Sequence, residues 1–134
     1  MAKNLEHIGI AVKDLNAAND LYASLLGTPP YKQEEVASEG VNTSFFRVNQ
    51  TKIELLEAQT PNSAIHQFIQ KKGEGIHHIA FEVENIHAEM QRLRDEGYQL
   101  LMEKPKPGAD NKLICFVHPK SAGGVLVELC QEIR

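Results

Sequence analysis

The chain has 134 residues, of which 42% are hydrophobic and 24% are charged, as is typical of one globular domain with a real core. Its formal net charge of −4 excludes a basic nucleic-acid-binding surface over the chain as a whole, and no apolar run is long enough for a membrane span. Cys115 and Cys130 stand alone, and the first residues lack the apolar region of a signal peptide. We therefore expect a cytoplasmic protein with two free thiols, no nucleic-acid partner and no membrane partner.

The first half of the chain predicts one strand, one helix and three further strands. Alternating apolar and small residues predict a strand over residues 6–12. The helix that follows has Asp14 or Asn16 as its N-cap, and Gly27 ends it. Polar turns then separate strands predicted at Tyr31–Ala37, Asn42–Val48 and Lys52–Ala58. The order is therefore βαβββ.

Two stretches of the first half recur in the second half. HIAFEVENI (78–86) repeats HIGIAVKDL (7–15), and LVELCQ (126–131) repeats KIELLE (52–57). A repeat of this kind indicates that one structural unit of about half the chain is used twice.

The second half therefore predicts the same element order as the first. A helix over residues 61–72 leads into it, and a strand over residues 77–83 opens it. Asn85 caps its helix and Gly97 ends it, before strands predicted at Gln99–Lys104, Leu113–Val117 and Val125–Gln131. We expect a single domain, residues 1–134, of the α+β class, in which two βαβββ modules form a curved, cup-like mixed sheet. The expected boundaries are about 4–60 for the first module, 61–72 for the linking helix and 75–132 for the second module.

Each half contributes a histidine at the start of one strand and a glutamate inside an apolar strand. Because large apolar residues flank each glutamate and face the helices, strand alternation turns the glutamate to the inner face of the sheet. Two carboxylates buried there without partners would cost several kcal/mol or become neutral, and a divalent cation removes that cost. This pattern favours one divalent ion per chain (Co²⁺, Zn²⁺, Ni²⁺ or Mn²⁺), with the ligands His7, Glu54, His78 and Glu128.

The other histidines fit a ligand role less well, because a single histidine is more often a core or surface residue. His77 has the strand parity of the apolar residues around it, so the repeat favours His78. His66 and His87 fall on predicted helices and should face solvent. His118 ends a strand before a proline, where a structural or substrate-contacting role is expected.

Paired βαβββ modules with His and Glu on their inner faces resemble the vicinal oxygen chelate superfamily, also called glyoxalase/bleomycin-resistance/dioxygenase-like. Within it, the chain is similar over essentially its whole length to the methylmalonyl-CoA epimerase family. The doubled histidine and the HPK…GGVLVEL ending are the most specific features. The stretches that carry the resemblance are HIGIAVKDL (7–15), ELLE (54–57), GIHHIAFEVENI (75–86) and HPKSAGGVLVELCQ (118–131).

This resemblance implies divalent-metal-dependent epimerisation at C2 of methylmalonyl-CoA through a metal-stabilised enolate, in a small, usually dimeric protein. His7, His78 and Glu128 match the family's metal ligands, and Glu54 sits where relatives carry Gln or Glu.

The proton-transfer groups are only partly implied by the resemblance. Glu128 is the first candidate for the base, and Glu54, Glu82 or a metal-bound water could serve the opposite face of the carbon. Some relatives have a second carboxylate base on the strand after Gly40–Val41. This chain has Asn-Thr-Ser at 42–44, so it offers no carboxylate there.

The acyl-CoA phosphates need local positive charge in an acidic chain. Residues 104–120 carry four lysines and one aspartate, a local net charge of +3. Lysines at the mouth of a cleft suit phosphate binding as point charges. The predicted substrate-binding residues are Lys104, Lys106 and Lys120, while Lys112 belongs to the same basic stretch.

Two other functions remain open on the same fold. A glyoxalase I-type lyase acting on a glutathione hemithioacetal also uses two His and two Glu. It would need cationic contacts for the glutathione carboxylates, and Arg47 is the only arginine before Arg92. The other alternative is a non-catalytic small-molecule-binding protein. We also expect a homodimer, because the edges of the strands at 6–12 and 77–83 need covering.

Overall fold

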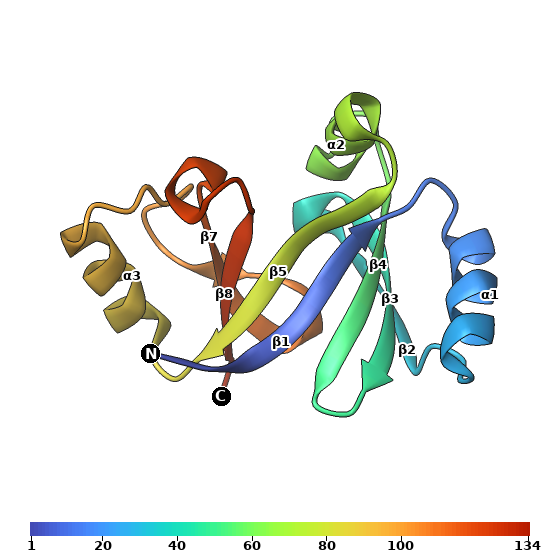
Figure 1. The fold of residues 1–134 in the computed structure, drawn as a ribbon, viewed down its shortest axis with the longest axis horizontal. Helices are drawn as coiled ribbons and strands as arrows, with labels where there is room; N and C mark the ends of the chain where they lie inside the picture. The colour runs from blue at the N-terminus through green and yellow to red at the C-terminus, as the bar shows by residue number, and fades with distance from the viewer. The chain divides into compact units, whose positions relative to one another are not determined.

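The computed structural model describes all residues, 1–134, and contains three α-helices and eight β-strands (Figure 1). The chain divides into two compact units, which we call module 1 (residues 7–77) and module 2 (residues 1–6 and 78–134). Each has the order βαβββ, so the predicted α+β class is confirmed. No helix has both the length and the apolar character that crossing a membrane requires. The elements are β1 (Ala2–Ala11), α1 (Leu15–Leu26), β2 (Lys32–Val36), β3 (Val41–Val48), β4 (Thr51–Ala58), α2 (Ala64–Lys72), β5 (Gly75–Val83), α3 (Ile86–Asp95), β6 (Lys106–Pro107), β7 (Lys112–Val117) and β8 (Val127–Glu132), with 3₁₀ turns η1 (Ala37–Glu39), η2 (Ala109–Asn111) and η3 (Pro119–Ala122).

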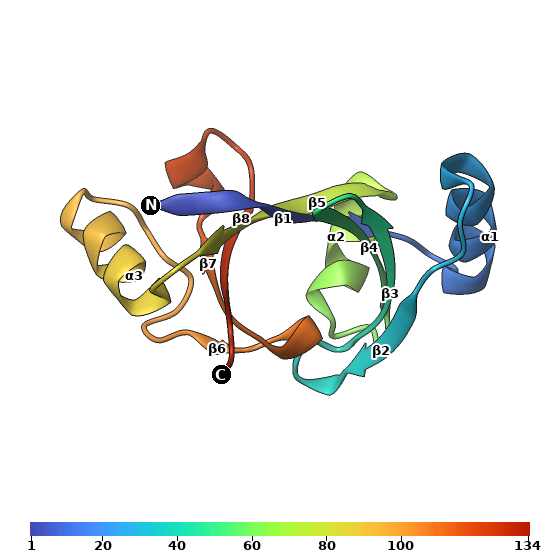
Figure 2. The same ribbon diagram turned by 90° about the horizontal axis from the view of Figure 1, so that it is seen from below.

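In module 1 the strands lie in the order β2–β3–β4–β1 (Figure 2). β2, β3 and β4 are antiparallel neighbours, and β1 runs parallel to β4. Helix α1 packs on one face of this sheet, where Leu55 and Phe46 are completely buried. Because successive side chains of a strand point to opposite faces, the neighbours of Leu55 point away from α1. The predicted inner orientation of Glu54 is therefore confirmed within this module.

Module 2 repeats this arrangement with the order β5–β8–β7–β6, and β5 runs parallel to β8. Its core lies between the sheet and α3, where Val127 and Leu129 of β8 pack. Glu128 lies between these two residues and therefore belongs to the other face. The remaining core residues are Val83, Ile86, Met90, Leu93, Cys115 and Val117.

The two modules agree down to individual register pairs. Glu54 lies opposite Gly9 of β1, and Glu128 lies opposite Ala80 of β5. The partner of each glutamate in the parallel strand, Gly9 in β1 or Ala80 in β5, is thus small. The repeat in the sequence is a repeat in strand register as well.

The same agreement extends to the helix N-termini. Asp14 accepts a hydrogen bond from the backbone N–H of Ala17 (3.1 Å), and Asn85 accepts one from Ala88 (3.0 Å). Both predicted caps are confirmed, and Asp14 rather than Asn16 is the cap in module 1.

One predicted strand is wrong. Residues 99–104 form only an isolated bridge, between Leu100 and Val117, and the strand that pairs with β7 is the two-residue β6. Pro105 and Pro107 lack the backbone N–H that a longer ladder needs, which explains why β6 is so short. The linking helix also starts later than predicted, at Ala64, because Ser63 caps it through the N–H of Ile65.

Candidate active site

In module 1 the structure brings together a buried histidine and a buried glutamate. His7 Nδ1 lies 3.0 Å from Glu54 Oε2, and the two residues are only 4% and 3% exposed. His7 comes from β1 and Glu54 from its parallel neighbour β4. Gly9, opposite Glu54, adds no side chain to the same face.

Module 2 contains the equivalent pair. His78 Nε2 of β5 lies 3.1 Å from Glu128 Oε1 of β8, and both residues are at most 6% exposed. The rings of His78 and Phe116 are in edge-to-face contact, with their centroids 5.9 Å apart. Phe116 lies opposite Glu128 in the β7–β8 register, so it fixes the position of the imidazole beside the carboxylate.

These donors fit a divalent metal ion. Imidazole nitrogens and carboxylate oxygens are ligands for Zn²⁺, Co²⁺, Ni²⁺ and Mn²⁺. His7 and Glu54 in module 1, and His78 and Glu128 in module 2, are all buried, and each belongs to a group of His and Glu side chains that could hold a metal ion. The carboxylates are buried away from water, and a bound cation would compensate their charge.

Two further acidic side chains belong to the strands that carry the histidines. Glu82 shares the inner face of β5 with His78, and it accepts a hydrogen bond from Asn4 Nδ2 (2.7 Å). Glu6, which precedes His7, is 6% exposed. The sequence interpretation overlooked Glu6. Its only signal in the sequence is its position next to a candidate ligand, and strand alternation would have turned it away from the site.

The two thiols take no part in this chemistry. Burial raises the pKa of Cys115 to about 11, and the nearby Glu128 carboxylate adds to the effect. Burial, followed by the charges of Glu128 and Glu6, also raises the pKa of Cys130. Both thiols therefore stay protonated near neutral pH and are poor metal ligands.

The other histidines occupy structural or surface positions. His77 packs edge-on against Phe68 of α2, with ring centroids 5.0 Å apart. His118 Nδ1 accepts a hydrogen bond from the backbone N–H of Lys120 at the start of η3, which is a structural contact, one of the two kinds expected for it. His87 is exposed as predicted, whereas His66 is half-buried.

The lysines of residues 104–120 fall into two groups. Lys104 and Lys120 are exposed, and Lys106 is half-buried in β6. Lys112 differs, because its side chain is buried and its ammonium lies 3.5 Å from a carboxylate oxygen of Glu132. Lys112 therefore has a role within the module.

The segment after Gly40–Val41 contains no acid and has two buried hydroxyls. Thr43 and Ser44 are completely buried, and neither hydroxyl has a hydrogen-bond partner. Asn42 donates a hydrogen bond to Glu57 (3.4 Å), whose other oxygen accepts one from the backbone N–H of Leu15 (2.8 Å).

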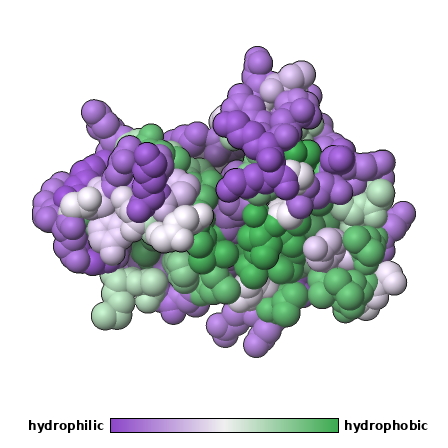
Figure 3. Space-filling view, turned by 45° about the horizontal axis from the view of Figure 1, so that its top comes forward, coloured by the Kyte–Doolittle hydropathy of each residue, from purple (hydrophilic) through white to green (hydrophobic).

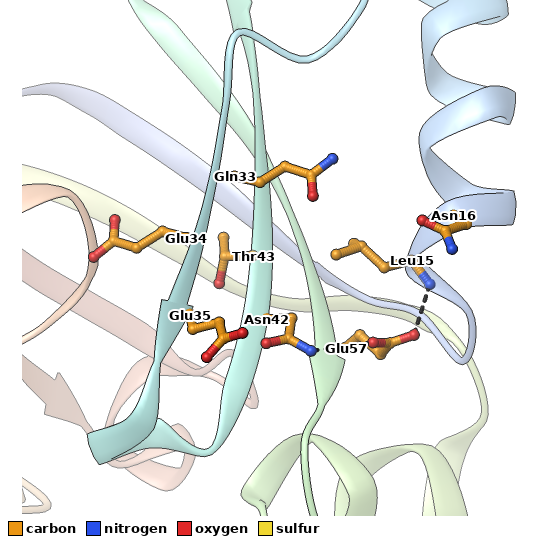
Figure 4. Close-up of a pocket in the computed structure, with 8 residues that line it drawn as sticks. All are labelled: Leu15, Asn16, Gln33, Glu34, Glu35, Asn42, Thr43 and Glu57. Carbon is orange, nitrogen blue, oxygen red and sulfur yellow. Dashed lines mark hydrogen bonds between the residues drawn. The ribbon is translucent and has the colours of Figure 1, made fainter.

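Asn42, Thr43 and Glu57 lie at a polar pocket of about 460 Å³ in module 1, beside the first turn of α1 (Figure 4). The pocket does not include His7 or Glu54. Its lining residues are Leu15, Asn16, Gln33, Glu34, Glu35, Asn42, Thr43 and Glu57. Glu57 is held there as a cap of α1, which gives its carboxylate a structural role.

Residues 6–116 match the family model described as the glyoxalase/bleomycin resistance protein/dioxygenase superfamily, so the chain belongs to this superfamily. Among its relatives are the mitochondrial methylmalonyl-CoA epimerase of Homo sapiens and the ethylmalonyl-CoA/methylmalonyl-CoA epimerase of Cereibacter sphaeroides. The human protein is 41% identical, with 95% of this chain and 73% of the relative covered. The bacterial protein is also 41% identical, with 98% and 99% covered.

A solved structure gives the same result. A variant of Streptomyces coelicolor methylmalonyl-CoA epimerase in complex with 2-nitronate-propionyl-CoA superimposes with a TM-score of 0.95 at 33% identity. The superposition covers 98% of this chain and 96% of that one. Within the superfamily, the chain therefore belongs to the methylmalonyl-CoA epimerases, as the sequence resemblance implied.

Proposed function

We propose that this protein epimerises C2 of methylmalonyl-CoA with the help of one divalent metal ion. The observation that carries the proposal is the pair of buried His–Glu contacts, one in each module, at equivalent positions of the repeat. The family relationship supports the same conclusion. The relative from Streptomyces coelicolor binds an acyl-CoA analogue, which supports an acyl-CoA substrate for this chain.

The proposed metal ligands are His7, Glu54, His78 and Glu128. A bound divalent ion would supply Lewis-acid stabilisation where negative charge develops on the thioester oxygen. The four residues offer two neutral imidazoles and two carboxylates, a set that offsets the charge of a divalent ion without cysteine. This donor set suits Co²⁺, Zn²⁺, Ni²⁺ and Mn²⁺.

Epimerisation requires one proton to leave C2 and another to arrive on the opposite face. We assign the first transfer to Glu128, because it is buried and its Oε1 lies 3.1 Å from His78 Nε2. The second transfer falls to Glu54 or Glu82, since the segment at 42–44 offers no carboxylate. The hydrogen bond from Asn4 holds Glu82 in place.

The phosphates of the coenzyme are proposed to contact Lys104, Lys106 and Lys120. Two of these side chains are exposed, so their ammonium groups are accessible to a ligand. Because Lys112 is engaged with Glu132, it is left out of the proposed contacts.

We further propose that the protein forms a homodimer and works in the cytoplasm. Buried free thiols fit a reducing compartment. For the dimer, module 1 has a mostly apolar groove of about 380 Å³, which includes Ile10, Ala17 and Leu21. Leu21 and Leu25 of α1 are 63% and 70% exposed, and Figure 3 shows hydrophobic surface in this region. A copy of the same surface would cover these side chains. Sedimentation that detects only monomer at micromolar concentration contradicts the dimer.

The activity is tested on the purified protein with two substrates, racemic methylmalonyl-CoA and the glutathione–methylglyoxal hemithioacetal. The epimerase proposal expects turnover of the first alone. Turnover of the second alone would identify a glyoxalase I-type lyase, and turnover of neither would favour a binding protein.

Solvent deuterium sharpens this test when each pure epimer is supplied separately. Two groups acting on opposite faces should place deuterium in the product epimer and leave the recovered substrate mostly unlabelled. A single group acting on both faces would return the original proton to a measurable fraction of product. The enolate mechanism fails if neither epimer exchanges its C2 hydrogen.

A further inference from the structure

Module 1 carries a cluster of cations stacked on aromatic rings, on the same face of the sheet as Glu54. Arg47 of β3 lies over the ring of Tyr31, with its guanidinium carbon 4.7 Å from the ring centroid. Lys32 of β2 lies over the ring of Phe45 at 5.0 Å. The two rings contact each other, with centroids 6.1 Å apart. Two cations are thus held by one pair of rings.

The strand register connects this cluster to Glu54. Phe45 is completely buried and lies directly opposite Glu54 in the β3–β4 pairing. Arg47 lies two residues farther along β3 and therefore points to the same side, roughly 7 Å away along the strand. An anion bound by Arg47 would be beyond direct contact with a carbon that reacts at Glu54.

Arg47 has its hydrogen-bond donors available. Its side chain forms no ion pair and no hydrogen bond with the protein, and it stacks on the ring of Tyr31. A guanidinium that is stacked on a ring keeps its planar fork of N–H donors pointing outwards, and this fork matches the oxygens of a phosphate. Lys32 adds a second positive charge, although Glu34, 3.3 Å from its ammonium, offsets part of it.

We infer that Arg47, with Lys32 in support, binds a phosphate group of the coenzyme part of the substrate. The inference rests on the proposed acyl-CoA substrate. In such a thioester a pantetheine arm separates the reacting acyl group from the diphosphate and the 3′-phosphate. A phosphate contact must therefore lie away from Glu54 but on the same face, where Arg47 lies. The basic stretch at residues 104–120 belongs to module 2, so module 1 supplies a cationic contact of its own.

The test compares two substrates that differ only in their phosphates, methylmalonyl-CoA and methylmalonyl-pantetheine. Arg47→Ala should raise KM for methylmalonyl-CoA about tenfold, the usual effect of losing one charge-assisted hydrogen bond, and leave kcat within about twofold. The same variant should leave both parameters unchanged for methylmalonyl-pantetheine. Arg47→Lys should recover part of the affinity, and Lys32→Gln should have a smaller effect than Arg47→Ala.

Arg134→Ala is the matched control, because it removes one arginine charge at an exposed position. It should leave KM for both substrates unchanged. An equal loss with both substrates in Arg47→Ala, or no loss with either, overturns the phosphate contact. If Arg47→Ala does not fold, Arg47→Gln keeps the aliphatic part of the side chain and serves in its place.

A binding measurement separates this inference from the proposed function. Titration calorimetry with coenzyme A and with adenosine 3′,5′-bisphosphate needs no turnover. If the wild type epimerises neither thioester but Arg47→Ala weakens coenzyme A binding about tenfold, the proposed reaction is wrong and the phosphate contact stands. If the wild type epimerises methylmalonyl-CoA and Arg47→Ala binds coenzyme A as tightly as the wild type, the phosphate contact is wrong and the reaction stands.

Discussion

Each module has one side chain that accepts a hydrogen bond from the first backbone N–H of its helix. In module 1 this side chain is Glu57 of β4, and in module 2 it is Gln131 of β8. Glu57 bonds the N–H of Leu15 at 2.8 Å, and Gln131 bonds the N–H of Ile86 at 2.7 Å. The geometry is the same and the charge is not. The repeat therefore preserves the shape of each contact while its chemistry has diverged.

The equivalent phenylalanines show the same divergence near the site. Phe45 lies opposite Glu54 and carries the ammonium of Lys32 on its face. Phe116 lies opposite Glu128 and packs instead against the ring of His78. One module uses the ring to hold a cation, and the other uses it to orient a candidate ligand. Positions related by the repeat should therefore respond differently to substitution.

The largest expected effect comes from removing a histidine of either pair. His7→Ala and His78→Ala should each lose the divalent ion and, with it, activity by roughly a hundredfold or more. His77→Ala is the neighbouring control, since His77 packs on Phe68, and it should keep the ion. Elemental analysis of protein purified without added metal measures this, and an ion retained in His78→Ala would refute the assignment made from the repeat.

The next largest effect should be a difference in rate loss between substitutions of the two glutamates. Glu128→Gln removes the proposed base and should slow epimerisation roughly a hundredfold or more. Glu54→Gln should cost less, about tenfold, because an amide oxygen can still accept a hydrogen bond from His7 Nδ1. Metal content must be measured in both variants before the rates are compared. Equal losses of rate at equal metal content would remove the distinction between the two carboxylates.

The internal repeat determines how much of this site the sequence predicts. Matching 7–15 with 78–86 selected His7 and His78, and strand alternation in the second repeated stretch placed Glu54 and Glu128 on the inner face. The cation cluster was out of reach, because it depends on which residues of β2 and β3 lie opposite each other, as Lys32 and Phe45 do. Pairing register between strands is set by packing and turn geometry, which hydrophobic periodicity alone does not reveal.

The ion pair of the buried Lys112 with the exposed Glu132 illustrates a second limit. In the sequence, Lys112 was one of four similar lysines in a basic stretch. Only the antiparallel register of β7 and β8 sets it beside Glu132 and withdraws it from solvent. The failed strand at 99–104 has a local cause instead, since the prolines that follow it stop the ladder.

Exchanging the charged acceptor Glu57 for a neutral one, and the neutral acceptor Gln131 for a charged one, should change the free energy of unfolding moderately and with opposite sign. Glu57→Gln should lower the free energy of unfolding by about 0.5 kcal/mol, because a negative charge near a helix N-terminus is favourable. Gln131→Glu should raise it by a similar amount for the same reason. Urea unfolding measures both changes. If both substitutions destabilise equally, the charge difference between Glu57 and Gln131 does not affect stability.

The smallest expected effect lies on the surface of α3. Arg92, and then the N-terminal ammonium, lower the pKa of Glu89 from its ordinary value of 4.5. A lowered carboxyl pKa contributes stability above the unfolded pKa, and this contribution is lost as the pH falls through the folded pKa.

Glu89→Gln should therefore lower the Tm by about 1–3 °C at pH 7 and have almost no effect near pH 2. Thermal unfolding followed by circular dichroism at both pH values measures this. A Tm difference that is as large in acid as at neutral pH would point to packing rather than to charge.

The protonated, buried thiols of module 2 also provide a way to observe how the protein opens. With a pKa of about 11, Cys115 is a thiolate in only about one molecule in ten thousand at pH 7. A disulfide reagent added to the folded protein should therefore react slowly, and the rate should report the opening of the β7–β8 pair. Because module 1 contains no cysteine, the colour released on reaction comes from module 2 alone. The native chain is in this sense already labelled in one half.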